Sequence, residues 1–124
     1  MRVGVTDQRG ELGAVYRGRA LFDLGPRTDL LCGCPRAKGM AFLLRAMNPQ
    51  VLAVDEVAGE EDAAALMGAA GCGVSLLATA HGEDLDGLMR RPATRVLLEE
   101  GIFQRLVTIR GRGAERTYHV EVLG

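Results

Sequence analysis

The sequence predicts an α/β fold, with a mostly parallel sheet flanked by helices and a C-terminal antiparallel hairpin. VLAV (residues 51–54) and VSLLAT (74–79) are short apolar runs, as expected for buried parallel strands. A helical segment that begins at residue 60 separates them, which gives the strand–helix–strand unit of parallel sheets. FQRLVTI and TYHVEVL then flank the polar turn RGRGAER, an arrangement typical of an antiparallel hairpin.

The segment before VLAV contains two further predicted elements and an irregular stretch. RVGVT (2–6) is predicted to be a short strand, and ELGAVYRG (11–18) to form a hairpin. Residues 23–35 are predicted to be irregular because they carry Gly25, Pro26, Gly33 and Pro35.

A helix is predicted to begin near Pro35, since proline suits the first helical position, and to stop at Asn48-Pro49. Its apolar residues follow the i, i+3, i+4, i+7 spacing of one buried face. These residues are Met40, Leu43, Leu44 and Met47.

The helix after VLAV is predicted to begin at three acidic residues, 60–62, because carboxylates stabilise the positive end of a helix dipole, and to end near Gly71 or Gly73. Two short helices are expected around 83–90 and 93–100, with Gly101 closing the second.

Composition limits the size and the function class of the chain. At 124 residues and 13.2 kDa, residues 1–124 are expected to form a single domain. Fifteen basic against sixteen acidic residues, with 4% aromatics, argue against a nucleic-acid binder. No apolar run approaches the ~20 residues of a membrane span, so direct membrane insertion is not expected. The three cysteines lack structural-zinc spacing and favour a reduced, cytoplasmic protein.

Two adjacent carboxylates, Asp55 and Glu56, follow the apolar strand VLAV. They match the pair that ends a Walker B strand, where the first acid orients magnesium through its water shell. The second acid can hold and polarise the water that attacks the γ-phosphate of a nucleotide. The alternative is a pair of surface acids flanking a turn.

Polar residues also follow the other predicted parallel strands, at 7–11 and at 79–81. Ligands of open α/β sheets bind beyond the carboxyl ends of the strands, so these segments are candidates for one site. His81 is either a sensor of the γ-phosphate or a hydrogen-bonded loop residue. Arginines that could neutralise phosphates are Arg9, Arg27, Arg90 and Arg91.

Several long stretches together resemble the stage III sporulation protein AA family. They are GPRTDLLCGCPRAKGMAFLLRAMNPQVLAVDEV, GVSLLATAHG, RRP and LLEEGIF, preceded by VGVTDQRGEL. The resemblance implies a RecA-like ATPase core, similar to the motor ATPases of type II secretion and type IV pili. Such a protein would form a hexameric ring and hydrolyse ATP with Mg²⁺. It would power a channel between mother cell and forespore, beside that channel's membrane proteins.

The resemblance also implies roles for individual residues. Asp55 and Glu56 would form the Walker B pair, with Asp55 holding magnesium through water. Thr79, His81 and Gly82 would correspond to a histidine box, and Asp7, Arg9 and Glu11 to an acidic box. Catalytic roles would fall to Glu56, His81, Glu11 and Arg9, and nucleotide-binding roles to Asp55, Asp7, Arg27 and Thr79. Gln8 stands where the family tends to have an acid, and Ala58-Gly59 lacks the arginine of secretion motors.

The sequence contains no phosphate-binding GxxxxGK[ST] motif, and Lys38, its one lysine, has different surroundings. The chain therefore resembles the C-terminal half of an ATPase core, and we expect it to be inactive alone. Loss of the loop's strand would expose two sheet edges, so self-association or rearrangement is expected. Two alternatives remain: a non-hydrolysing remnant that binds partner subunits, and an unrelated small α/β enzyme using Asp55, Glu56 and His81.

Overall fold

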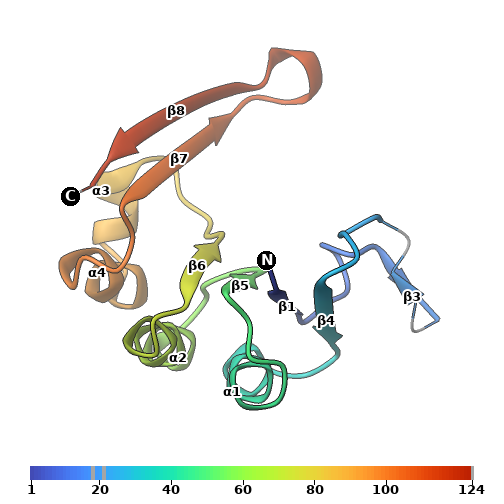
Figure 1. Cartoon of the computed structure of the whole chain (residues 1–124). Coiled ribbons are helices and arrows are strands. Elements are labelled where there is room, and N and C mark those ends of the chain that lie inside the picture. The colour runs from blue at the N-terminus through green and yellow to red at the C-terminus, as the bar shows by residue number, and fades with distance from the viewer. Residues whose placement is uncertain (18, 21, 124) are drawn as a thin grey trace. The chain divides into compact units, whose positions relative to one another are not determined.

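A computed structural model of the chain describes residues 1–17, 19–20 and 22–123. The chain divides into two compact units, Met1–Ala80 and His81–Gly124, and each is described by itself. The predicted α/β class is confirmed, with a parallel sheet flanked by helices and a C-terminal antiparallel hairpin (Figure 1).

The first unit is built on a four-stranded parallel sheet with the order β4-β1-β5-β6. Its strands are β1 (Val3–Asp7), β4 (Thr28–Cys32), β5 (Val51–Val54) and β6 (Ser75–Ala78). Thr6 of β1 pairs with Leu31 on one side and Val54 on the other. Because the strands are parallel and in this register, the residues that follow β1, β5 and β6 lie together at the carboxyl ends of the strands.

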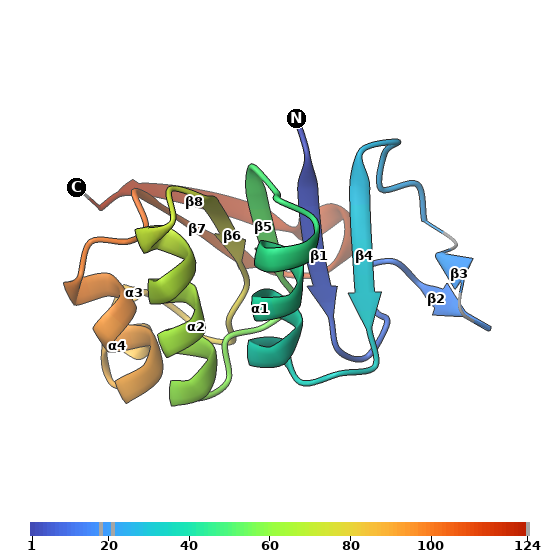
Figure 2. The ribbon, with the colours of Figure 1, turned by 60° about the horizontal axis from the view of Figure 1, so that its bottom comes forward.

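Two helices, α1 (Arg36–Ala46) and α2 (Glu60–Gly71), lie against one face of this sheet (Figure 2). The core between them consists of side chains with almost no exposed surface: Met40, Leu43, Leu52, Val54 and Leu66. Burying one such side chain contributes about 1.5–3 kcal/mol, so this layer holds the helices in place over the strands.

The buried face of α1 differs from the predicted one. Met40 and Leu43 are buried as predicted, but Leu44 is only partly buried and Met47 is 38% exposed. Met47 is the C-cap, so it stands beyond the last helical residue. The buried stripe extends instead toward the start of the helix, through Gly39 and Arg36.

The prediction that residues 23–35 are irregular is wrong for Thr28–Cys32. This segment is β4, which pairs with β1 along its whole length, from Val3–Thr28 to Asp7–Cys32. The glycines and prolines flank the strand and do not interrupt it. As an edge strand, β4 has no fully buried residue, so its sequence lacks a clear apolar pattern.

Two other predicted strand regions gave mixed outcomes. The hairpin predicted at 11–18 lies further along the chain, as the short antiparallel pair β2 (Val15–Tyr16) and β3 (Arg19–Ala20); residue 18 of the predicted range lies outside the described residues. The prediction that VSLLAT is a buried strand is wrong, because β6 is an edge strand and its Leu77 is 62% exposed. An apolar run alone therefore did not distinguish a central strand from an edge strand.

The second unit contains the two short helices and the hairpin that were predicted. The helices are α3 (Leu85–Met89) and α4 (Pro92–Glu99). The hairpin strands are β7 (Arg105–Arg110) and β8 (Thr117–Val122), joined through a 3-10 turn at Gly113–Glu115. Among the described strands, β7 and β8 form a sheet of their own.

One face of the hairpin is apolar and exposed. Cross-strand pairing puts Val107 opposite Val120 and Ile109 opposite Tyr118, with Val122 at the end of the same face. These five side chains are 50–68% exposed. Two strands alone make a marginally stable sheet, and an apolar face of this kind favours association. Among the described residues, no helix has the length and apolar character needed to cross a bilayer.

Candidate functional site

Arg36 and three carboxylates, those of Asp55, Glu56 and Asp62, form an ionic cluster that we call the arginine cluster. Its members come from three elements. Arg36 is the first residue of α1, Asp55 and Glu56 follow β5, and Asp62 lies in the first turn of α2. The cluster thus joins both helices to the carboxyl end of a central strand.

Each nitrogen of the Arg36 guanidinium faces a different carboxylate. Nε lies 2.8 Å from Asp55 Oδ1, Nη2 lies 3.3 Å from Glu56 Oε2, and Nη1 lies 3.9 Å from Asp62 Oδ2. The Arg36 side chain is only 9% exposed, so these contacts are shielded from water. Three carboxylates face one guanidinium, which leaves negative charge in excess at this edge of the sheet.

Asp55 connects the ends of three strands. Its Oδ2 accepts a hydrogen bond from the backbone N–H of Gln8, 3.1 Å away, just after β1. Its own N–H donates to the carbonyl of Thr6 at 3.1 Å. The hydroxyl of Thr79, just after β6, donates to the Asp55 carbonyl. The structure therefore brings Asp55 and Thr79 together, two of the residues that the sequence analysis assigned to one site.

Asp62 holds the start of α2 as well as Arg36. Its Oδ2 accepts hydrogen bonds from the backbone N–H groups of Ala58, at 3.0 Å, and Gly59, at 3.4 Å. An acidic side chain at the third helical position that reaches back to the N-cap satisfies donors that the helix leaves unpaired.

Asp7 organises the loop that follows β1. Its side chain is fully buried, with Oδ1 accepting from the N–H of Glu11 at 2.8 Å and Oδ2 from the N–H of Gly13 at 2.9 Å. Arg9 and Glu11, the other members of the predicted acidic box, are exposed on this loop. Asp7 thus fixes the backbone that carries them.

The remaining predicted residues lie elsewhere. Arg27 is exposed, and its carbonyl accepts from the N–H of Val3 at 3.0 Å, which places its backbone at the amino end of β1. That is the end of the strand opposite to Gln8 and Asp55. His81 is exposed and is the first residue of the second unit.

The donor set suits a magnesium ion bound through water. Carboxylate oxygens are the hard ligands that Mg²⁺ prefers, and it usually retains several waters. Each Asp55 oxygen already accepts one N–H, from Arg36 or Gln8, so its remaining lone pairs can accept from the waters of an ion. Among the described residues, no group of three or more His, Cys, Asp or Glu could hold a metal ion directly.

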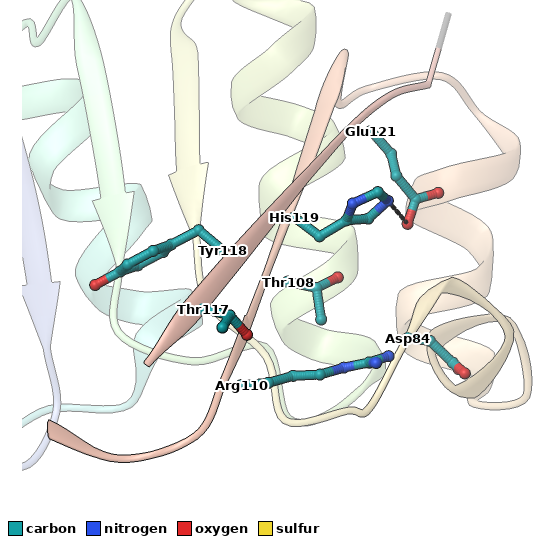
Figure 3. A pocket seen from close by; sticks show the side chains of 7 residues that line it. All are labelled: Asp84, Thr108, Arg110, Thr117, Tyr118, His119 and Glu121. Atoms are coloured by element: carbon teal, nitrogen blue, oxygen red, sulfur yellow. Dashed lines mark ion pairs between the residues drawn. The ribbon is translucent and has the colours of Figure 1, made fainter. Parts of the chain in front are cut away.

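A second candidate region lies in the second unit. A hollow of about 470 Å³ is formed by the hairpin and the start of α3 (Figure 3). Arg110 Nη2 donates to the carbonyl of Glu83 at 3.0 Å, and His119 Nε2 lies 3.8 Å from Glu121 Oε1. None of the residues that line the hollow was predicted to be a site residue. The lining consists of Asp84, Thr108, Arg110, Thr117, Tyr118, His119 and Glu121.

Sequence reasoning missed Arg36 and the second role of Asp62. One signal was available, because a cation at the first position of a helix is disfavoured by the dipole and needs an anionic partner. Asp62 was identified only as a helix-start residue, a role that the structure confirms. Its contact with Arg36 depends on the packing of α1 beside α2, which is a tertiary feature.

Known proteins resemble this chain over most of its length. Residues 1–119 match the protein family described as "Sporulation stage III, protein AA". The chain is also 38% identical, over 109 residues, to "Stage III sporulation protein AA" of Bacillus subtilis (strain 168). That alignment covers 88% of this chain and 36% of the relative, so the chain spans about a third of the relative's length. The chain therefore belongs to the Sporulation stage III, protein AA family.

Proposed function

We propose that this chain supplies the Walker B half of an ATP-hydrolysing site in a protein that acts in sporulation. Family membership supports the sporulation role. The observation that carries the hydrolytic role is the position of Asp55, whose side chain and backbone are bonded to residues just after β1 and β6. Open α/β sheets bind their ligands beyond the carboxyl ends of their strands, where these residues lie.

In this proposal Asp55 orients the waters of a magnesium ion, and Glu56 holds the water that attacks the γ-phosphate. When bound, Mg²⁺ neutralises phosphate charge. Thr79 fixes the backbone of Asp55 through its hydroxyl, and Asp7 orders the loop that presents Arg9 and Glu11. His81 keeps its proposed role as a sensor of the γ-phosphate. Arg27 lies at the amino end of β1, so its proposed role is contact with the nucleotide of a neighbouring subunit.

The phosphate-binding loop would be supplied by a segment outside these 124 residues, because no GxxxxGK[ST] motif occurs among them. The chain alone is then inactive, and the complete protein works as a hexameric ring beside the membrane proteins of a channel. The exposed apolar face of the hairpin, which includes Val107 and Tyr118, supports contact with other subunits.

The test compares Glu56→Gln with the unaltered full-length protein. The amide keeps the shape of the side chain but cannot attract a proton from water, so we expect nucleotide binding to be retained and hydrolysis to be lost. Binding is measured with a fluorescent ATP analogue and hydrolysis by phosphate release. Normal hydrolysis by the variant would refute the role of Glu56. Turnover by the 124-residue chain alone, at ~1–100 s⁻¹, would refute the half-site proposal.

A second candidate function is a non-hydrolysing module that binds partner subunits. The neutralising contact of Arg36 with Asp55 and Glu56 favours it, because the contact occupies acids that hydrolysis would use. A module of this kind should tolerate Glu56→Ala in a sporulation assay, whereas a hydrolytic site should not.

A further inference from the structure

Arg36 contacts both acids to which the proposed function gives the chemistry. Its Nε–H donates to Asp55 Oδ1 at 2.8 Å and its Nη2 donates to Glu56 Oε2 at 3.3 Å. The guanidinium is buried, whereas Arg45 in the last turn of the same helix is exposed and bonds only to the carbonyl of Ala41 among the bonds described. Arg36 is thus part of the site, whereas Arg45 lies on the exposed surface of the helix.

The shape of the guanidinium gives these contacts a directional effect. It is planar and rigid, and the Nε and Nη2 hydrogens project from the same edge of the plane. Carboxylates bound along one edge are fixed relative to each other as well as to the arginine. Asp55 and Glu56 are adjacent in sequence, and without such a partner their side chains could point to opposite sides of the backbone.

The opposite side of the guanidinium is held by Asp62. Nη1 lies 3.9 Å from Asp62 Oδ2, an oxygen that also accepts from the N–H groups of Ala58 and Gly59. Asp62 is therefore anchored to the start of α2, and its carboxylate lies at ion-pair distance from Arg36 without a hydrogen bond. The contacts of Arg36 thus extend from the start of α2 to the two acids, and the two hydrogen bonds to Asp55 and Glu56 are the shorter ones.

We propose that Arg36 is a positioning residue, which orients Asp55 and Glu56 toward a hydrated magnesium ion and the attacking water. This inference rests on the proposed hydrolytic function. Arg36 does not itself touch the reacting atoms. A lysine at this position would carry the same charge but could not bind two carboxylates along one planar edge.

The test uses the full-length protein with Arg36→Lys, Arg36→Gln and, as the matched control, Arg45→Gln. We expect both Arg36 variants to lower kcat by about 10- to 100-fold, as loss of supporting contacts does at metal sites. The KM for ATP should change by no more than about twofold, because the phosphate cradle is elsewhere. Arg45→Gln should retain the unaltered kcat and KM.

A second measurement follows the acids without nucleotide or catalysis. In protein labelled with ¹⁵N-glutamine and ¹⁵N-glycine, the amide signal of Gln8 reports on Asp55, and that of Gly13 reports on Asp7. We expect Arg36→Lys to shift the Gln8 signal and leave the Gly13 signal in place. General loss of structure would move both signals.

The outcomes separate the inference from the proposed function. A kcat unchanged in both Arg36 variants, or an unmoved Gln8 signal, would overturn the positioning role. A lowered kcat with both amide signals displaced would also overturn it, since the arginine would then be serving the fold as a whole. Full hydrolysis by Glu56→Gln would overturn the proposed function, whatever the amide signals show.

Discussion

Replacement of Gly39 by alanine tests how closely α1 packs on β1. A Cβ added to Gly39 would lie 2.8 Å from Thr6 Oγ1, 3.3 Å from Thr6 Cβ and 3.4 Å from Cys34 Sγ. Two effects oppose each other. Alanine is favoured over glycine inside a helix by about 1 kcal/mol, whereas overpacking a core costs about 1–3 kcal/mol. We therefore expect Gly39→Ala to lower the free energy of unfolding by about 0–2 kcal/mol.

Two companion variants separate these effects. Gly68 lies within α2, and an added Cβ there would meet no atom within 4 Å, so Gly68→Ala should stabilise the protein by about 1 kcal/mol. Thr6→Ala removes the hydroxyl that crowds Gly39. In the Thr6→Ala background, Gly39→Ala should be less unfavourable by about 0.5–3 kcal/mol than in the unaltered chain.

The assay is urea denaturation of the unaltered chain, the two single variants at Gly39 and Thr6, their double variant, and Gly68→Ala. The coupling free energy comes from this double-mutant cycle. The reasoning is refuted if Gly39→Ala has the same effect in both backgrounds, to within about 0.5 kcal/mol. It is also refuted if Gly39→Ala stabilises the chain as much as Gly68→Ala does.

Three further predictions concern single features. Thr6 Oγ1 is buried and has no hydrogen-bond partner in the described part of the chain, so Thr6→Val should raise the free energy of unfolding by about 1 kcal/mol in urea denaturation. A loss of stability would show that the hydroxyl has a partner. Asp7→Ala would leave two loop N–H groups unpaired and should cost about 1–3 kcal/mol or more, with Asp7→Asn costing less; equal losses would argue against the hydrogen bonds. Ile109→Thr together with Val120→Thr should reduce self-association in sedimentation velocity, because both side chains lie on the exposed hairpin face. An unchanged sedimentation coefficient would count against that face as a contact surface.

Much of the fold was predictable because local patterns and tertiary structure agree. Polar and apolar side chains alternate along β8 and from Val107 to Arg110 of β7, and the start of α2 is marked by its acidic residues. The strand β4 was missed because an edge strand buries little and its turn-forming neighbours dominate the pattern. Leu77 was wrongly predicted to be buried for a different reason, because β6 is an edge strand that nevertheless carries an apolar run.

The candidate site was predictable only in part. Asp55 and Thr79 could be assigned to one edge because parallel strands end together. The contact of Arg36 with Asp55 could not be found by spacing, since it depends on how α1 is rotated over the sheet. Gly39 allows α1 to approach β1 closely in that orientation, and a glycine in a helical pattern does not reveal which residue it will contact.

One oxygen atom makes part of the site and part of the helix a single cooperative unit. Oδ2 of Asp62 accepts the N–H groups of Ala58 and Gly59 and also faces Arg36. Opening of the first turn of α2 would remove one of the three carboxylates that face Arg36, and loss of the arginine would remove a cation that faces the carboxylate capping that turn. Hydrogen exchange at the Ala58 and Gly59 amides should therefore be slower when the arginine cluster is intact and faster when it is broken. Any partner or nucleotide that engages Asp55 or Glu56 would be detected at these two amides, beyond its own contact surface.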